Sequence, residues 1–395
     1  MYKRNFGKTI IMSLVISLFI LTVIPSLTQA IPAFARKYRM SCNTCHAPIP
    51  RLKEYGNEFA GNGFVLEDKD APRYFVESGD DRLDLIRELP FAVRMEGFVK
   101  HQTETEKNID LTTPYNIKLL SGGALTKNIA YYFYFFFSER GEVAGVEDAY
   151  IMFNNLFKQD LDIYIGQFQV CDPLFKRELR LTYEDYILYK TKIGDSSMAN
   201  LAYDRGFMIT LGLETGTDII FELINGNGIG AADDFRTYDN DKYKNFMGRI
   251  SQGLTDFARI GGFGYYGKEG FDNPNELTMF GGDATLSYKE NLELNFQYLM
   301  RTDDNPSFET TKPDDEIKTE GMMAELIFMP EGDRSKLYGT LLYNMVDSDD
   351  NDADYETFTV HAGYLVKTNL RLIVENTFDI LNDENRFVAG FIAAF

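Results

Sequence analysis

From Phe91 to the last residue, Phe395, apolar and polar residues alternate along the chain. Segments of about ten residues carry an apolar side chain at every second position, and the connections between them are alternately short and long. In NLELNFQYLM, residues 291–300, the apolar side chains fall on one face of an extended strand and the polar ones on the other. One face suits lipid and the other a wet lumen, so the pattern predicts an all-β transmembrane β-barrel of antiparallel strands.

About sixteen such segments can be counted, and an even number is expected of a single-chain bacterial barrel. We expect strands that begin near Phe91, Tyr115, Ile129, Val143, Leu161, Tyr203, Thr217, Lys242, Ala258, Leu277, Leu292, Ile317, Leu337, Tyr355, Leu370 and Arg386. The last segment, RFVAGFIAAF, ends the chain on an aromatic residue, which is typical of the C-terminal strand of outer-membrane barrels. The alternative is a soluble β-sandwich or propeller, which the lipid-like strand faces and the lack of a per-blade signature disfavour.

The lengths of the connections orient the predicted barrel, because bacterial barrels have short periplasmic turns and longer outer loops. Short connections occur at residues 126–128, 214–216, 289–291 and 367–369, and long ones at 228–242, 302–316 and 347–356. If the first strand starts in the periplasm, every long loop falls outside, and these loops hold a large share of the acidic residues. Such loops either hydrate a cell surface and bind divalent ions, or attract a cationic substrate.

The longest connection runs from Cys171 to Asn200 and carries several charged side chains and four aromatic rings. Its charged residues include Arg177, Arg180, Glu184 and Asp185. A loop of this length usually has a function of its own. We expect it to fold toward the lumen as a constriction or plug, and an ordinary outer hairpin is the alternative.

The first thirty residues have the pattern of a secretory signal peptide. Lys3, Arg4 and Lys8 precede an apolar run from Ile10 to Ile24, and small residues close the region at Ala30. The alternative, a retained membrane anchor, would need a run of ~20 apolar residues, which is longer than this one. We therefore expect export, cleavage after Ala30 and a location in the bacterial outer membrane.

Composition narrows the class of protein further. The formal net charge is −20, which excludes electrostatic binding of nucleic acid. The chain has 24 Tyr, 32 Phe and no Trp, and its mean hydropathy of −0.26 excludes a helical membrane protein and fits a barrel. Three cysteines are too few for a disulfide framework, and Cys171 stands apart from the other two as a buried or rim thiol.

The motif that carries chemistry is SCNTCH, in which Cys42, Cys45 and His46 have the spacing C-x-x-C-H. Two thiols at this spacing can each add to a vinyl group at one edge of a haem, and the histidine that follows can reach the iron axially. We therefore predict one covalently attached haem c, with His46 as an axial ligand of its iron. A zinc site or a redox disulfide is the alternative, but zinc needs further Cys or His ligands and a thioredoxin-like pair needs a βαβ setting.

Residues 31–88 precede the barrel and are too few for an ordinary hydrophobic core. The stretch from Pro50 to Gly61 has one apolar helical face and predicts a helix. A haem would supply the missing core, so we expect a small helical monohaem cytochrome c domain at 31–88 and a porin-like barrel at 89–395. Because electron tunnelling falls steeply with distance, we expect this domain to plug the lumen. The lumen charges expected around it include Arg94, Arg249, Arg371 and Glu375.

The second axial ligand of the predicted haem is less defined. The chain has three histidines, and His46 is already assigned. The alternation in the segment from Tyr355 turns His361 into the lumen, whereas His101 falls on the outer side near the rim. His361 is therefore the candidate, although a lumen histidine can also be a plain lining residue. Met40 lies two residues from Cys42, too close to reach the opposite face of the haem ring. The remaining alternative is an iron without a second protein ligand, whose sixth position is vacant or holds water.

The run PAFARKYRMSCNTCHAPIPRLKEYGNEFAGNGF, residues 32–64, followed by an aromatic-rich barrel, resembles the fused cytochrome-porins of the bacterial outer membrane, whose best-known members are the Cyc2-type iron oxidases. The resemblance implies one haem in or under the barrel, with Cys42 and Cys45 as attachment thiols and His46 as axial ligand. It implies electron transfer across the outer membrane, from extracellular Fe(II) to a periplasmic carrier such as a soluble cytochrome c. Similar fusions occur beyond iron oxidisers, so two alternatives stay open: an electron conduit to an extracellular acceptor, and a diffusion porin with a structural haem domain.

Overall fold

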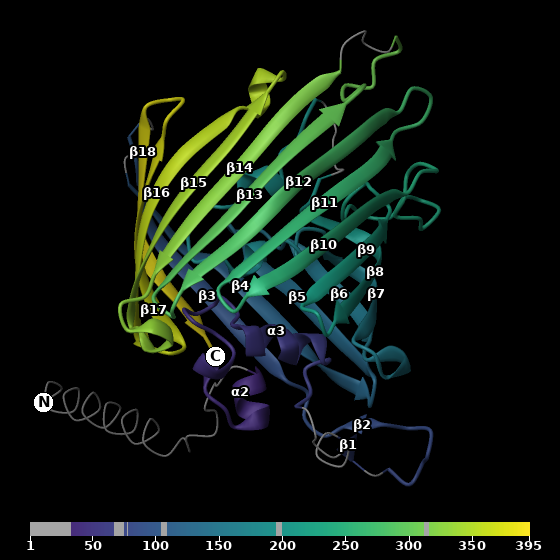
Figure 1. Cartoon of the computed structure of the whole chain (residues 1–395), viewed down its shortest axis with the longest axis vertical. Helices are drawn as coiled ribbons and strands as arrows, with labels where there is room; N and C mark the ends of the chain where they lie inside the picture. The colour runs from purple at the N-terminus through teal and green to yellow at the C-terminus, as the bar shows by residue number, and fades with distance from the viewer. Residues whose placement is uncertain (1–32, 67–74, 77, 104–108, 195–199, 312–315) are drawn as a thin grey trace, which may run out of the picture.

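The computed structural model describes residues 33–66, 75–76, 78–103, 109–194, 200–311 and 316–395. The predicted signal peptide, residues 1–30, lies outside the described residues. Sixteen strands, β3 to β18, each pair with their neighbours in sequence, and β18 pairs antiparallel with β3 to close the barrel (Figure 1). The closed antiparallel barrel predicted from the alternation is therefore confirmed.

The barrel strands are β3 (Phe91–Gln102), β4 (Ile109–Thr126), β5 (Ile129–Glu139), β6 (Gly145–Phe153), β7 (Leu161–Gln169), β8 (Tyr203–Leu213), β9 (Thr217–Ile224), β10 (Asn245–Thr255), β11 (Ala258–Glu269), β12 (Asn275–Tyr288), β13 (Leu292–Asp303), β14 (Ile317–Phe328), β15 (Leu337–Ser348), β16 (Tyr355–Lys367), β17 (Leu370–Asp379) and β18 (Glu384–Ala394). Short 3₁₀ helices lie in the connections: η3 (Leu156–Lys158), η4 (Arg177–Leu179), η5 (Ile187–Tyr189), η6 (Gly332–Arg334) and η7 (Asn351–Ala353).

Most predicted strand starts coincide with the observed ones, and β4 differs most. The predicted start is Tyr115, directly after Pro114, which has no N–H to donate to a sheet. The structure extends β4 back to Ile109 through a bulge, since the register with β3 shifts between Glu96 and Phe98, opposite the proline. A bulge is a place where a sheet tolerates an unpaired residue, so the strand passes through the proline.

The two faces of the strands differ in polarity as the alternation requires. On β13, Leu294 and Phe296 point outward and are each 37% exposed, whereas Asn295 and Gln297 point inward and are buried. Other outward positions are also large and apolar, such as Ile250 and Phe280. An outer face of this kind suits lipid contact. No helix in the described ranges is long and apolar enough to cross a membrane.

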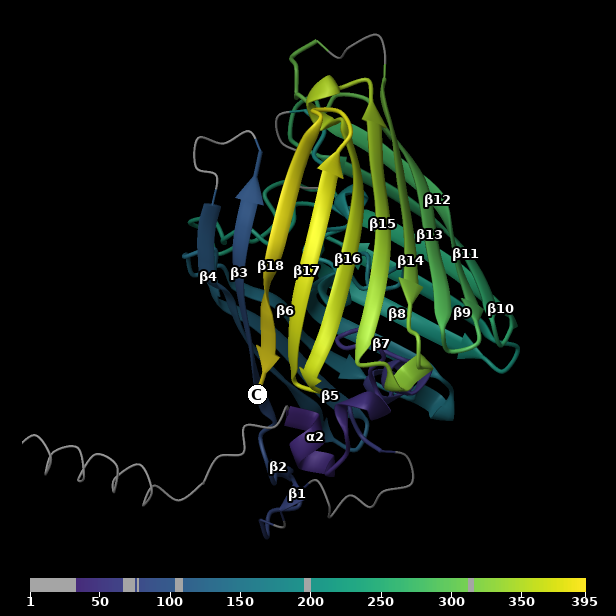
Figure 2. The same ribbon diagram turned by 90° about the vertical axis from the view of Figure 1, so that its left-hand side faces the viewer.

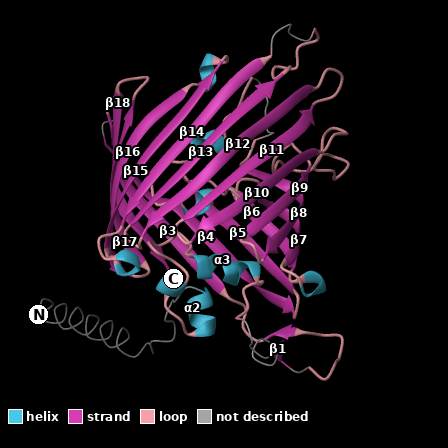
Figure 3. Cartoon of the chain, in the orientation of Figure 1, coloured by secondary structure: helices cyan, strands magenta, loops and turns pink. Residues whose placement is uncertain are grey.

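The N-terminal segment, residues 33–66, packs at the end of the barrel where the connections are short (Figures 2 and 3). It contains α2 (Ala33–Tyr38), η1 (Cys42–Thr44) and α3 (Glu54–Gly61), and a small sheet of β1 (Phe75–Val76) and β2 (Leu85–Ile86) follows it. The predicted helix ends at Gly61 as expected but begins at Glu54 instead of Pro50. The residues before Glu54 form a turn, in which Arg51 N donates to Pro48 O at 2.9 Å and Leu52 forms a bridge with His46.

The long connection after Cys171 folds into the lumen, as predicted. Backbone N–H groups of Tyr183 and Glu184 donate to the carboxylate of Glu375 on β17, at 2.7 and 2.8 Å. Asn344 on β15 donates to the carbonyl of Asp185 at 2.8 Å. A hydrophobic core inside the barrel joins this connection to strands around it, and its fully buried members include Cys171, Tyr189, Leu277, Met323 and Leu342. The lumen is therefore packed with side chains at this level.

Candidate functional site

The C-x-x-C-H motif folds as one tight turn. Ser41 caps η1, with its Oγ accepting from Asn43 N at 3.4 Å. The carbonyl of Cys42 then accepts from the N–H groups of both Cys45 and His46, at 3.1 and 3.0 Å. Both thiols are free, and the turn brings them and the imidazole to one cavity. Local hydrogen bonding thus gathers the three predicted residues in the way that their spacing suggests.

His46 is held by its own loop. Its Nδ1 lies 2.7 Å from the carbonyl of Pro50, so Nδ1 is assigned as the protonated nitrogen and Nε2 is left as the electron-pair donor. Burial lowers the pKa of His46 below its ordinary value, which favours the neutral ring that binds metals. Burial also raises the pKa of Cys42 and Cys45, which keeps both as thiols. In metal-binding histidines, the ring nitrogen that does not bind the metal usually donates a hydrogen bond, often to a carbonyl.

The cavity that these residues line has a volume of about 290 Å3. The N-terminal segment, the inner wall of the barrel from β3 to β7 and the connection after Cys171 all contribute to it, and so do Thr368, Asn369 and Ala394 near the C-terminus. Its aromatic wall is continuous, since the Phe34 and Phe64 rings stack at 5.0 Å and the Phe64 and Tyr132 rings at 5.5 Å. The lining residues used below are Cys42, Cys45, His46, Gly56, Arg94, Asp148, Gln169, Asp172, Lys176 and Glu178.

Two observations test whether this cavity suits a haem. Helix α3 lies so close to the motif that a Cβ at Gly56 would come within 2.4 Å of Cys45 O. Above it, Arg94 pairs with Glu96 at 2.6 Å and donates to Glu178 O at 3.3 Å, yet its Nε is buried without a partner among the described residues. A buried guanidinium N–H needs an acceptor, and a haem carries carboxylates. Two thiols, an imidazole, an aromatic wall and an unsatisfied guanidinium are groups that fit a covalently bound haem.

The N-terminal segment is tied to the barrel at points around its end. Arg51 forms an ion pair with Glu293 on β13, and Lys53 Nζ lies 2.7 Å from Asp333 in η6. On the other side, Asn155 Nδ2 donates to Asn62 Oδ1 at 3.1 Å. Because the barrel residues in these contacts are far apart in the sequence, they hold the segment at several points around the end of the barrel.

His361 faces the lumen, as its parity predicted, but it does not line this cavity. Its Nδ1 lies 2.9 Å from Glu375, and its ring stacks on Tyr338 at 5.8 Å between centroids. Met40, which the sequence argument set aside, does line the cavity. Of the predicted lumen charges, Arg94 lines the cavity and Arg371 contacts the N-terminal segment, whereas Arg249 pairs with Asp283 at 2.5 Å on another part of the wall.

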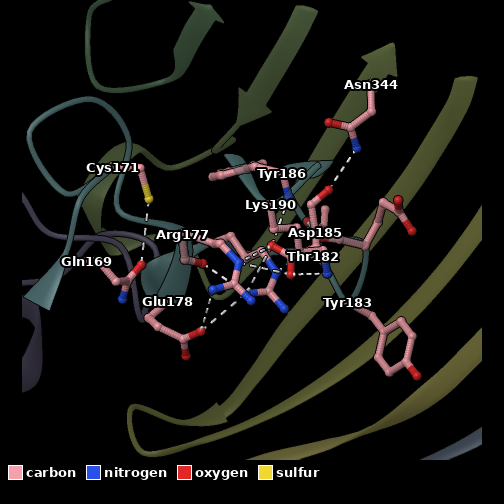
Figure 4. A network of polar contacts seen from close by, with 12 residues as sticks. Gln169, Cys171, Arg177, Glu178, Thr182, Tyr183, Asp185, Tyr186, Lys190 and Asn344 are labelled. Atoms are coloured by element: carbon pink, nitrogen blue, oxygen red, sulfur yellow. Dashed lines mark hydrogen bonds and ion pairs between the residues drawn. The ribbon is translucent and has the colours of Figure 1, made fainter. Parts of the chain in front are cut away.

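A network of charged side chains holds the lumen connection next to the cavity (Figure 4). Asp185 is its centre, with Arg177 Nε at 2.9 Å, Lys190 Nζ at 2.9 Å and Arg180 Nη1 at 3.6 Å. Glu178 accepts from Lys118 Nζ of β4 at 2.7 Å, which links the connection to the wall. No group of three or more His, Cys, Asp or Glu side chains in the described part of the chain is placed to hold a metal ion.

Comparison with known proteins gives the fold and no family. No family model and no curated protein matches the chain. Among solved structures, the chain is similar to an anion-selective porin from Comamonas acidovorans, with a TM-score of 0.56 and 10% identity over 78% of this chain and 99% of that one. It is similar to OmpF of Salmonella typhi in complex with daunomycin, with a TM-score of 0.53 and 12% identity over 78% of this chain and 97% of that one. The barrel therefore has the fold of outer-membrane porins.

Proposed function

We propose that this protein is an outer-membrane electron-transfer protein with one covalently attached haem. The observation that carries the proposal is the convergence of Cys42, Cys45 and His46 on one cavity that also contains the unsatisfied Nε of Arg94. Cys42 and Cys45 would hold the group covalently, His46 Nε2 would bind its iron, and Arg94 would pair with a carboxylate. When bound, a haem supplies one-electron redox chemistry.

The extent of the cavity along the lumen supports transfer across the membrane. At the short-connection end it is lined by Thr368 and Asn369, and in the other direction it reaches Gln169, the last residue of β7 before the long connection. A site that reaches into the barrel lies closer to the outer membrane face than one in a separate periplasmic domain. This placement shortens the distance that an electron must cover.

The direction we propose is from extracellular Fe(II) to a soluble periplasmic cytochrome c. The net charge of −20 and the acidic long loops attract divalent cations and repel anionic donors. An outward conduit to an extracellular acceptor uses the same site and differs only in the potentials of its partners. Stopped-flow mixing of the oxidised protein with Fe(II) tests the direction: reduction within seconds supports it, and no spectral change contradicts it.

A diffusion porin with a structural haem domain is the second candidate, because the barrel has the fold of porins. The packed lumen speaks against it: Leu181, Tyr189 and Leu342 are each at most 1% exposed at the level where a solute would pass. Liposome swelling separates the two candidates. We expect proteoliposomes to exclude small sugars, and swelling at the rate of an open porin would favour the diffusion channel.

A further inference from the structure

The lining of the cavity includes acidic side chains as well as the two thiols. Asp148 is the fourth residue of β6 from the long-connection end and is 6% exposed. Its carboxylate lines the cavity, and it takes part in none of the hydrogen bonds or ion pairs found among the described residues. Burying a charged carboxylate without a partner is unfavourable in free energy, so we expect Asp148 to bind a proton or a cation.

Asp148 is not the only acidic group there. Asp172, three residues after β7, lines the same cavity. Lys176 forms an ion pair with Asp172 at 3.6 Å and is partly exposed, which makes it a weak counter-ion. Gln169, whose Oε1 accepts a long contact of 3.8 Å from Cys171 Sγ, adds an amide oxygen to the same surface.

We propose that Asp148 and Asp172 form a binding site for a divalent cation inside the lumen, with Gln169 Oε1 as a neutral oxygen ligand. Two carboxylates that line one cavity are stabilised when a cation lies between them. Oxygen ligands of this kind suit hard divalent ions, which keep several water molecules in their coordination shell.

This site extends the proposed function by giving a place where the substrate ion could bind. Only the identification of the cation as the substrate rests on the proposed function. Fe(II) is a divalent ion of this class, and here it would lie in the cavity that also contains Cys42, Cys45 and His46. Substrate binding would then take place within the barrel, and the acidic outer loops would serve to concentrate the ion. The binding itself depends on Asp148 and Asp172 and not on any bound cofactor.

Titration with Mn(II), followed by the loss of its aqueous EPR signal, tests the site on the purified full-length protein. High ionic strength screens the exposed acidic loops, so that a buried site accounts for most of the Mn(II) binding that remains. We expect the wild-type protein to bind one Mn(II) that Asp148→Asn and Asp172→Asn each weaken by about tenfold or more. Equal Mn(II) binding by wild type and both variants would overturn the proposal and indicate a proton at Asp148.

Two controls make the result specific. Asp162→Asn changes another buried lumen carboxylate, which already accepts from Asn155 N at 2.8 Å and does not line the cavity, so it should bind Mn(II) as the wild type does. A Cys42→Ala, Cys45→Ala double variant removes the attachment thiols and should also retain Mn(II) binding. Retention there separates this site from the proposed haem, and loss of Mn(II) binding in that variant would overturn the claim that the carboxylates alone make the site.

Discussion

Arg371 of β17 donates from Nη1 to the carbonyl of Ile49 at 3.0 Å, and so joins the barrel wall to the loop that supports His46. The same Nη1 lies 2.8 Å from Tyr338 Oη, which fixes the guanidinium against the wall. The position of the imidazole therefore depends on the barrel as well as on its own loop.

Replacing Arg371 by Met should loosen the N-terminal segment by about 1.5–3 kcal/mol, the usual worth of a hydrogen bond to a charged group. The barrel should persist, because its strand pairing does not depend on this side chain. Limited proteolysis in detergent measures the effect as faster cleavage within residues 33–66. Arg249→Met is the matched control, since Arg249 also faces the lumen but pairs with Asp283. Equal cleavage rates in the two variants would contradict the proposed role of Arg371.

Gly56→Ala should impair haem attachment. The new Cβ would meet Cys45 O at 2.4 Å and Leu52 Cδ2 at 2.9 Å, so α3 must move away from the motif at a cost of about 1–3 kcal/mol. Gly61→Ala, at the end of the same helix, places its Cβ in open space and should have no such effect. Haem staining of the two variants at equal protein amounts measures the difference, and full staining of Gly56→Ala would refute it.

Asp185→Asn should open the lumen. The substitution leaves Arg177, Arg180 and Lys190 without their shared carboxylate, and breaking a buried charge pair costs about 3–5 kcal/mol. The connection should then leave the lumen more often, and single-channel conductance in planar bilayers should rise. Asp239→Asn breaks an ion pair with Lys244 in an outer loop and serves as the control. An unchanged conductance in Asp185→Asn would show that this network does not close the barrel.

His361→Ala should leave the absorption spectra of the oxidised and reduced protein unchanged. The imidazole lies against Glu375 and Tyr338 and does not line the cavity with His46. Its loss should instead loosen Tyr183 and Glu184, whose N–H groups share the Glu375 carboxylate. A shifted Soret band or a changed reduction potential in this variant would restore His361 as a ligand or close neighbour of the iron.

The barrel could be predicted from the sequence because its signal is local. Alternation fixes which side chains face lipid, as at Phe296 and Gln297, and turn lengths fix which end is which. The helix start at Glu54 could not be predicted from the sequence, because a proline is tolerated in the first turn of a helix. Only the hydrogen bond from Arg51 N and the bridge between Leu52 and His46 show that the preceding residues form a different turn.

The site was only partly predictable, since alternation gives the face of a residue and not its neighbours across the lumen. The alternation correctly predicted that Arg94 and His361 face the lumen. It could not show that Arg94 lines the cavity and His361 does not. Asp148 was missed because the β5–β6 register shifts between Tyr134 and Phe135, which interrupts the alternation just before it. No sequence signal marks Asp148, because the bulge beside it is visible only in the register of the paired strands.

The central claim is that the cavity beside Cys42 and Cys45 holds one covalently bound haem, and the intact mass of the membrane-extracted protein tests it most directly. We expect the mass of the chain from Ile31 to Phe395 plus one haem, together with a pyridine haemochrome spectrum of haem c. The Cys45→Ala variant should show one thioether link fewer. A mass equal to that of the bare chain would contradict the account.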